Sequence, residues 1–417
     1  MPENENLPSL FLDELHVKGF KSIEDLEARL NPGLNILIGK NGAGKSNFLE
    51  FLDSAIATIY KKKGFSFQSA FLKLNDRNNN RFDLNIRKPT KKNLLGESNR
   101  VNDELYHHSL FINDSIVFDS YDEEIIGKEF DFNGKKIKSS RSINTILLKL
   151  GHSFISPLYI RFNLTEQLDG IATPGIIQIP LIYDFIDWEF GKTTRFLTDI
   201  IDNASYSFQN TYEDKLMALP EDRDTFEREK IIQSVDVSWF LENLIIPEES
   251  IGNLIRFSPI QGLRFNEGIN IYRDEKSITA ENIKLEFLIN ERWIPWSHLS
   301  DGTKRLFYLI TEITNNKTGL ILIEEPELGI HPHQFDLLMQ FIKEQSLQKQ
   351  IILSTHSPKA LDHLEEDELD KILIAVYDRE KGTQLHHLNP EQIHKAKTYM
   401  NEVGYLSDYW SLSDLEE

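Results

Sequence analysis

The stretch GKNGAGKS, from Gly39 to Ser46, decides the fold because of what stands on either side of it. Before it runs the apolar segment GLNILIG, which predicts a short buried strand. After it, NFLEFLDSAIATIY has the spacing of an amphipathic helix. The predicted order is therefore strand, glycine-rich turn and helix, and the apolar face of the helix consists of Phe48, Leu52, Ala55, Ile56 and Ile59.

The same stretch matches the pattern G-x-x-x-x-G-K-[ST] of a phosphate-binding loop. Such a loop curls its backbone N–H groups around a β-phosphate, and Gly42 and Gly44 permit that close approach. Lys45 would reach the β- and γ-phosphates, and the Ser46 hydroxyl would bind Mg²⁺. The sequence thus predicts an ATP or GTP site formed by Gly39, Lys40, Asn41, Gly42, Ala43, Gly44, Lys45, Ser46 and Asn47.

A second apolar run, Leu320 to Ile323, is typical of a strand buried on both faces of a parallel sheet. Two carboxylates, Glu324 and Glu325, follow it at the end where open α/β sheets bind their ligands. Adjacent strand residues point to opposite sides, so the two need not share a role. We assign Glu324 to the Mg²⁺ shell through water, and Glu325 to the base that orients water at the γ-phosphate.

Two further segments are ambiguous when taken alone. IILSTHSP predicts another buried strand, which ends near His356; this histidine could be structural or could contact a γ-phosphate. HLSDGTKR, residues 298–305, precedes the apolar helix LFYLI, and its serine could be an ordinary helix cap. The alternative is a second anion site formed by Ser300, Asp301 and Gly302 at the positive end of that helix.

The spacing of these segments resolves the ambiguity. Glu324 follows Lys45 only after a very long insertion, far longer than in P-loop kinases or small GTPases, whereas Ser300 and His356 stand a short distance before and after Glu324. This order resembles the ATP-binding-cassette (ABC) class of P-loop ATPases, with HLSDGTKR as signature, EEPELGIHP as Walker B plus D-loop, and THSP as switch histidine. Within that class the motifs are most similar to the RecF and overcoming-lysogenization-defect (OLD) ATPases.

The resemblance implies a shared site. In this class the signature residues, here Ser300, Asp301 and Gly302, cap the γ-phosphate of ATP bound to a second subunit. One chain has one phosphate loop and one signature, so a homodimer would complete two sites. The resemblance also places three groups at or near the nucleotide: Phe20 and Lys21 on the adenine or phosphates, Gly329 and His331 in the D-loop at the dimer interface, and Gln167 as a candidate for the glutamine loop.

The resemblance further implies an α/β fold with a mixed central sheet, an antiparallel β subdomain and a helical insertion, or lid. We expect an N-terminal ATPase lobe over residues 1–155, with the phosphate loop. A mainly helical insertion is expected over 156–255, where the pattern becomes polar and helical. A C-terminal lobe over 256–417 would carry the remaining motifs, after strand-like segments resume at LRFNEGINIYR.

Composition limits the location and the partners. The chain has 417 residues, no cysteine and a net charge of −20, which excludes thiolate metal sites and argues against a uniformly basic nucleic-acid binder. It shows neither a secretory signal nor an apolar run long enough to span a membrane, so we expect a cytoplasmic protein without a membrane partner. Residues 61–100 carry a local charge of +8 and are either solvated loops or a face for DNA.

Several functions fit these motifs. The leading hypothesis is a Mg²⁺-dependent ATPase that switches a separate effector, such as a TOPRIM-like nuclease or toxin, in anti-phage defence. The residues after His356 lack the Glu plus Asp-x-Asp constellation of that nuclease, so we expect it on another chain. The alternatives are a RecF-like DNA-repair ATPase, a transporter ATPase and an ATP-binding scaffold. The second carboxylate, Glu325, argues against a scaffold.

Overall fold

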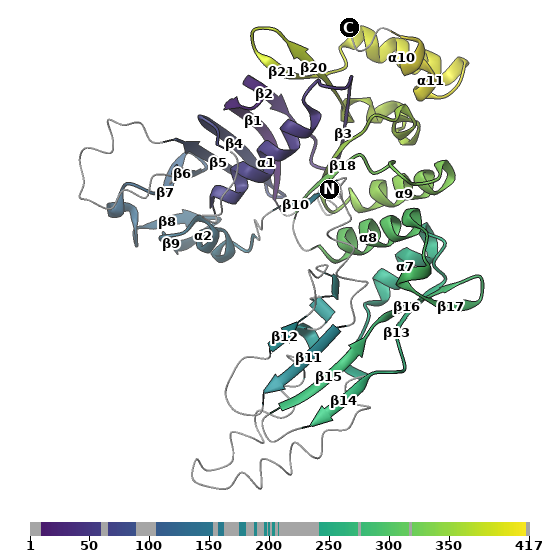
Figure 1. Ribbon diagram of the computed structural model, residues 1–417. Helices are drawn as coiled ribbons and strands as arrows, with labels where there is room; N and C mark the ends of the chain where they lie inside the picture. Colours follow the sequence, from purple (N-terminus) through teal and green to yellow (C-terminus); the bar gives the residue numbers. More distant parts are fainter. Residues whose placement is uncertain are drawn as a thin grey trace, which may run out of the picture. The chain divides into compact units, whose positions relative to one another are not determined.

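The computed structural model describes most of the chain. The described residues are 10–59, 66–88, 106–152, 157–161, 175–180, 187–189, 196–197, 199–200, 202–204, 207, 242–273, 277–316 and 319–413. They belong to two compact units (Figure 1). The first unit comprises Met1–Phe162, Lys317–Leu328 and Ile342–Glu417, and the second unit comprises Asn163–Asn316 and Gly329–Phe341.

A 12-stranded mixed sheet organises the first unit. Five neighbouring strands of this sheet are parallel, and the apolar sequences of its central strands are buried on both faces, as such strands require. The strands predicted at GLNILIG, LILI and IILS are thereby confirmed. In spatial order the parallel strands are β10 (Leu158–Ile160), β18 (Leu320–Glu324), β19 (Gln350–Ser354), β3 (Leu34–Ile38) and β20 (Ile372–Asp378).

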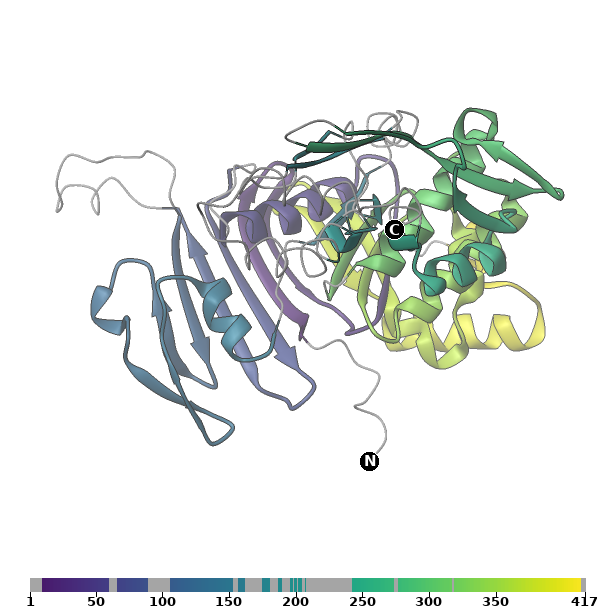
Figure 2. The ribbon, with the colours of Figure 1, turned by 90° about the horizontal axis from the view of Figure 1, so that it is seen from below.

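Seven further strands continue the sheet in antiparallel pairing. Residues of β4 alternate between buried and half-buried, which is the pattern of a strand with one face on the core. In spatial order the seven are β21 (Gly382–His387), β2 (Ile23–Arg29), β1 (Leu10–Phe20), β4 (Ser69–Asp76), β5 (Arg81–Arg87), β6 (His107–Ile112) and β7 (Ser115–Asp119). The hairpin of β8 (Glu129–Phe132) and β9 (Lys135–Lys138), the short helix η1 (Glu123–Ile125) and α2 (Ile143–Lys149) lie beside the last of these strands (Figure 2).

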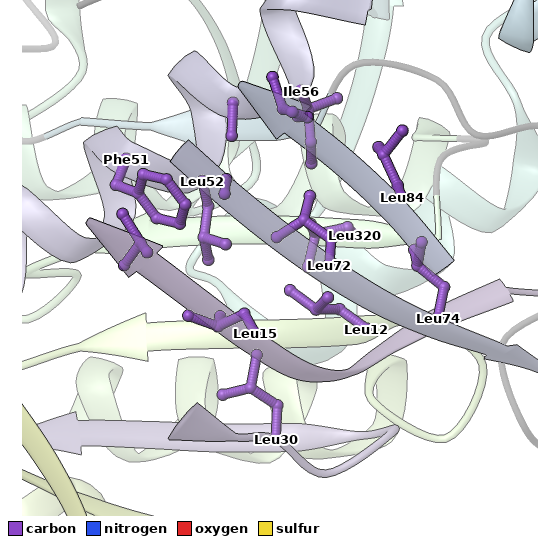
Figure 3. Packing of buried hydrophobic residues seen from close by; sticks show 14 of the residues in the cluster. Leu12, Leu15, Leu30, Phe51, Leu52, Ile56, Leu72, Leu74, Leu84 and Leu320 are labelled. Carbon is purple, nitrogen blue, oxygen red and sulfur yellow. The ribbon is translucent and has the colours of Figure 1, made fainter. Parts of the chain in front are cut away.

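Helix α1 (Lys45–Ile59) anchors the glycine-rich turn to this sheet. Its predicted apolar face is confirmed, because Phe48, Leu52 and Ile56 are at most 1% exposed. They belong to one cluster with residues such as Leu72 of β4, part of which is drawn in Figure 3. Burying each large apolar side chain contributes about 1.5–3 kcal/mol, so the start of α1 is firmly held.

The remaining elements of the first unit follow the switch histidine. The C-terminal helix is capped by Asp362, whose Oδ1 accepts from the Ser407 N–H at 2.8 Å. Leu406 and Trp410 are buried, whereas Tyr405 and Leu412 are exposed. The apolar side chains of this C-terminal segment, residues 405–412, are therefore packed only in part. These elements are η3 (Pro358–His363), η4 (Glu366–Lys371), α10 (Pro390–Glu402) and α11 (Leu406–Leu412).

The second unit combines two small antiparallel sheets with helices. Its core includes Phe287, Trp296 and Phe307, whose rings contact one another at centroid distances of 5.1–5.7 Å. One sheet has the order β12 (Asp187–Glu189), β11 (Gly175–Pro180), β15 (Ser277–Ile283) and β14 (Asn270–Arg273), and the other has the order β13 (Gly262–Phe265), β16 (Leu285–Ile289) and β17 (Arg292–Pro295). The helices of this unit whose full bounds the structure describes are α7 (Glu248–Phe257), η2 (Trp296–His298), α8 (Asp301–Asn315) and the first part of α9 (Pro332–Gln345).

The compact units divide the chain differently from the predicted lobes. Residues 163–316 fall into one unit, so the strands of 262–295 group with the insertion and not with the C-terminal ATPase lobe. The described residues of the expected helical insertion, 156–255, include strands β10, β11 and β12 as well as helix. Gln167 lies outside the described residues, as do parts of the basic stretch 61–100. Among the helices that the structure describes, none is long and apolar enough to span a membrane.

Candidate functional site

The phosphate loop follows β3 directly and requires glycine at three positions. Gly39, Gly42 and Gly44 all have positive φ angles, of +152°, +83° and +97°. A side chain at Gly39 would collide with the Ala375 carbonyl of β20, and one at Gly44 would collide with Thr383 of β21. At Gly42 a Cβ would meet nothing within 4 Å, so there the backbone angle alone favours glycine. The loop is thus packed against β20 and β21 at Gly39 and Gly44, and it is open at Gly42.

Lys45 is the lysine of this loop that is predicted to reach the phosphates. Its side chain is buried, and its Nζ donates to the Gly39 carbonyl at 2.6 Å and to the Lys40 carbonyl at 3.3 Å. The first-turn N–H groups of α1 have no acceptor within the helix, and the helix dipole makes this end positive. Because the exposed Ser46 also lies here, the loop offers an anion site with a hydroxyl beside it.

The two predicted carboxylates lie at the end of β18. Glu325 has a φ of +46°, a left-handed conformation that is uncommon outside glycine. Its N–H donates to the Ser354 carbonyl of β19 at 2.8 Å, which holds this turn against the neighbouring strand. Since β19 lies between β18 and β3, the carboxylates, His356 and the phosphate loop all follow neighbouring parallel strands. The prediction that His356 follows a strand beside the carboxylates is confirmed.

The imidazole of His356 lies between Lys45 and Glu325. Lys45 Nζ is 3.2 Å from His356 Nδ1, and His356 Nε2 is 2.9 Å from Glu325 Oε1. Because an ammonium group only donates, we assign Nδ1 as the acceptor and Nε2 as the nitrogen that donates its hydrogen to the carboxylate. The three side chains therefore form one hydrogen-bonded run, Lys45–His356–Glu325.

Glu324 has a partner that the motifs do not reveal. The Tyr159 hydroxyl on β10 donates to Glu324 Oε2 at 3.3 Å. Burial, and then the charge of Glu324, raise the pKa of Tyr159 far above its ordinary value, so the hydroxyl remains a donor. The Arg161 guanidinium lies 4.6 Å from the centroid of the Tyr159 ring and is 3.4 Å from Glu50 of α1. A tyrosine on the edge strand thus orients the carboxylate assigned to Mg²⁺.

Glu327 is a second residue that the motif analysis passed over. Its Oε1 accepts from the Thr355 hydroxyl at 2.8 Å and from the His356 N–H at 2.9 Å. Glu327 is the last residue of EEPE in the sequence, but no motif spacing predicted a role for it.

Phe20 lies in the core, and Lys21 pairs with a glutamate of α1. The Phe20 side chain is 0% exposed and packs edge-on against Phe51 of α1, with ring centroids 5.7 Å apart. It is therefore a core residue in this structure, in contrast to the expected contact with adenine. Lys21 forms an ion pair with Glu50, and Asn47 donates to the Ser22 hydroxyl at 2.6 Å.

The signature residues lie in the second unit, at the start of α8. Ser300 is the helix cap, and its Oγ accepts from the Thr303 N–H at 3.2 Å. Gly302 is packed so closely that a Cβ there would come within 2.8 Å of the Gly329 carbonyl in the predicted D-loop. Ser300 and Asp301 are exposed. His331 caps the start of α9, where its Nδ1 accepts from the His333 N–H at 3.3 Å.

The donor set at the first unit suits a magnesium nucleotide. Ser46 and Glu324 supply oxygen, the element that Mg²⁺ prefers, and protein sites for Mg²⁺ commonly add substrate phosphates to one or two carboxylates. The open space beside Gly42 and the buried Lys45 ammonium group suit the phosphates themselves. The residues present therefore fit ATP with Mg²⁺.

The phosphate loop follows β3, the paired carboxylates follow β18, and His356 follows β19, the strand between those two. Together with the contacts of His356, this arrangement defines a P-loop ATPase of the ABC class. The chain belongs to the family described as "AAA domain, putative AbiEii toxin, Type IV TA system", which matches residues 34–362. The matched range includes the phosphate loop, both carboxylates, the signature turn and His356. The predicted class and the mixed α/β fold are confirmed.

The chain also resembles individual proteins. It is 23% identical to the Septu protein PtuA of Bacillus thuringiensis over 369 residues, which cover 84% of this chain and 72% of PtuA. It is 49% identical to the DNA replication and repair protein RecF of Limosilactobacillus reuteri (strain DSM 20016) over 41 residues, 10% of this chain and 11% of RecF. A solved SMC head bound to the C-winged helix domain of ScpA aligns with a TM-score of 0.42 and 14% identity, covering 92% of this chain and 99% of that one.

Proposed function

We propose that this protein hydrolyses ATP at the carboxyl ends of its parallel strands. The observation that carries the proposal is the hydrogen-bonded run Lys45–His356–Glu325, which joins a phosphate-binding lysine to a carboxylate. The attacking water would form a bond to the γ-phosphorus as the bond to the bridging oxygen breaks, giving ADP and phosphate. Glu325 would orient that water and accept its proton, and His356 would contact the γ-phosphate.

Lys45, Ser46 and Glu324 would hold the charged substrate in place. Lys45 and the loop N–H groups would bind the β- and γ-phosphates, which fixes the direction of attack. Ser46, and Glu324 through water, would hold Mg²⁺, which neutralises developing charge on the phosphate oxygens. Tyr159 would keep the Glu324 carboxylate oriented, because its hydroxyl donates to one oxygen of that group.

Glu325→Gln tests the hydrolytic role. The variant retains the shape of the side chain but cannot accept a proton, so we expect turnover to fall by about 100-fold or more. ATP binding should be retained, and closed dimers should accumulate. Phosphate release, equilibrium binding and light scattering measure these outcomes, and Glu402→Gln, at an exposed carboxylate that ends α10, is the matched control. Unimpaired turnover in Glu325→Gln would remove Glu325 from this role.

We also propose that each ATP lies between two copies of the chain. The exposed signature residues Ser300 and Asp301 support this proposal, as does the positive end of α8. These groups would cap the γ-phosphate held by the phosphate loop of the other copy. Gly329 and His331 follow in the D-loop, beside Gly302 in the same unit, and would line the same interface.

Mixing two inactive variants tests this arrangement. Lys45→Ala destroys the phosphate loop and Ser300→Arg blocks the signature, so neither variant should turn over alone. A heterodimer of the two would contain one intact composite site, and activity should recover to at most half of the wild-type rate. Normal ATP turnover by either variant alone would contradict the shared site.

The ATPase would act as a nucleotide-controlled switch for a separate effector in a cytoplasmic defence module. The family description, which names a toxin–antitoxin system, and the similarity to a Septu protein over most of the chain support a role of this kind. The effector would be a nuclease or toxin, such as a TOPRIM-like nuclease. Copurification of the chain with the product of the neighbouring gene, carried out once with ATP and once with ADP, tests the switch. The proposal requires that the amount of complex differ between the two nucleotides.

A RecF-like role on DNA is the second candidate, and the short matches to RecF favour it. It predicts ATP-dependent binding of duplex DNA that weakens steeply with salt, because phosphate contacts release counterions. Fluorescence anisotropy with a labelled duplex at several salt concentrations measures this. Binding that is unaffected by ATP would count against the DNA role.

A further inference from the structure

Glu327 links the turn that carries the catalytic carboxylate to the turn that carries the histidine. It lies two positions after Glu325, beyond the end of β18, and it reaches across to the end of β19. There its Oε1 accepts two hydrogen bonds, from the Thr355 hydroxyl at 2.8 Å and from the His356 N–H at 2.9 Å. Both donors belong to the histidine turn.

The Thr355 hydroxyl extends this contact along the turn. Thr355 is 0% exposed, and its Oγ accepts from the Ser357 N–H at 2.9 Å while donating to Glu327. One carboxylate oxygen therefore fixes the backbone on both sides of the His356 Cα, directly at its N–H and through the hydroxyl at the next residue. Hydrogen bonds to a charged acceptor are stronger than those between neutral groups, so two of them can hold a short turn in one conformation.

The position of His356 depends on this backbone. Its side chain contacts Lys45 on one side and Glu325 on the other, at 3.2 and 2.9 Å, so a small rotation of the turn would break one contact or both. Side chains that orient a reacting group must be held to about 0.5 Å. Glu327 forms these hydrogen bonds with the backbone and hydroxyl of the histidine turn. It would therefore influence the contacts of the His356 side chain with Lys45 and Glu325 only indirectly.

We propose that Glu327 is a positioning residue that sets His356 for its contact with the γ-phosphate, acting through the backbone of residues 355–357. The inference rests on the proposed hydrolysis of ATP at this site. Removing the acceptor should leave ATP binding intact and slow the chemical step. It should also loosen the His356 N–H whether or not the enzyme turns over.

The first experiment measures kcat and KM for ATP in two backgrounds. In the wild-type background, Glu327→Leu should lower kcat roughly 10- to 100-fold, with KM changed less than about twofold, as for other residues that orient a reacting group. Glu327→Gln keeps an oxygen acceptor and should retain most of the rate. In a His356→Ala background, Glu327→Leu should cost less than about twofold more, because the residue it positions is absent. Glu402→Leu is the matched control in both backgrounds.

The second experiment does not depend on turnover. Hydrogen–deuterium exchange of the segment containing His356 should be faster in Glu327→Leu than in the wild type, since the N–H loses its acceptor. Thr355→Val, which removes the hydroxyl at similar volume, should have a smaller effect, and Thr355→Ser should have little effect. Thermal unfolding of each variant reports whether the fold is retained.

Two results would overturn the inference. One is exchange at His356 that is unchanged in a folded Glu327→Leu protein. The other is a full, multiplicative loss of kcat from Glu327→Leu in the His356→Ala background, which would show that Glu327 acts independently of the histidine. A wild-type chain that does not hydrolyse ATP contradicts the proposed function instead, and in that case the exchange result still decides the role of Glu327.

Discussion

Two regions that carry the predicted motifs use their polar groups in opposite ways. One is the edge of the first unit's sheet formed by the carboxyl ends of its parallel strands, called the edge here, and the other is the signature turn of the second unit. At the edge, His356 contacts Lys45 at 3.2 Å and Glu325 at 2.9 Å. At the turn, Ser300 caps its own helix, and the side chain of Asp301 is 100% exposed. The edge combines groups that follow β3 with groups that follow β18 and β19, much later in the chain, whereas the turn is a local structure of a few residues.

This difference indicates two kinds of task. Groups that act on a reacting atom work best when they are oriented before the substrate arrives, because no reorganisation is then needed during the reaction. An exposed helix start with a capping serine instead suits recognition of an anion carried by another surface. Under the proposed function, the first unit would carry out the chemistry, and the second unit would recognise the nucleotide held by another copy of the chain.

The largest expected effect comes from breaking the edge at Lys45. Lys45→Ala removes a buried ammonium group that would bind two phosphates, so ATP affinity should fall by about 100-fold or more. Isothermal titration with ATP and Mg²⁺ measures the loss. Lys395→Ala, at a surface lysine of α10 paired with Glu391, is the control and should bind normally. Wild-type affinity in Lys45→Ala would contradict the phosphate-loop assignment.

The next effect sharpens the contrast by changing the turn alone. In Gly302→Ala the new methyl group would lie 2.8 Å from the Gly329 carbonyl, and the turn must shift to accommodate it. Overpacking of this kind costs about 1–3 kcal/mol, so we expect turnover to fall roughly 30-fold while ATP still binds to the phosphate loop.

Gly252→Ala on α7 is the matched control for this change, because a methyl group there meets nothing within 4 Å. Steady-state turnover and equilibrium ATP binding, measured on both variants, separate the two outcomes. If Gly302→Ala lost binding and turnover equally, the division of tasks between edge and turn would be wrong.

The smallest effect concerns the orientation of Glu324. Tyr159→Phe removes one donor to its carboxylate, so turnover should fall about tenfold and need more Mg²⁺ to saturate. Because burial and the charge of Glu324 raise the pKa of Tyr159, the hydroxyl stays protonated, and the pH profile should keep its shape. Magnesium titrations of turnover measure this, with the exposed Tyr377→Phe as control. An unchanged magnesium requirement would show that Tyr159 serves only the fold.

The sequence was sufficient wherever a motif followed a continuous apolar strand. Gly39 to Ser46, Glu324 with Glu325, and His356 could each be placed, because parallel strands align their carboxyl ends and the motif fixes the residue. The helix cap at Ser300 was equally visible, since capping depends on neighbouring residues alone.

Contacts that depend on strand order could not be predicted. Tyr159 lies far before Glu324 in the sequence, on a short strand, and the contact arises because β10 pairs with β18. Phe20 was assigned to the nucleotide because the resemblance to ABC-class ATPases implies a contact at this position. The positive φ of Gly19, +69°, interrupts the simple alternation along β1, so its period could not show that Phe20 points into the core.

The packing of Gly44 against Thr383 has a consequence for how the protein is made. The loop follows β3, one of the first strands to leave the ribosome, yet it packs against β21, which comes after all the other described strands. In the sheet, β3 itself lies between β19 and β20. A nascent chain therefore lacks the strand that packs against its phosphate loop until β21 has been synthesised. Under the proposed function, ATP binding would therefore depend on the synthesis of this strand, because copies that end before β21 would lack one side of the phosphate loop's support.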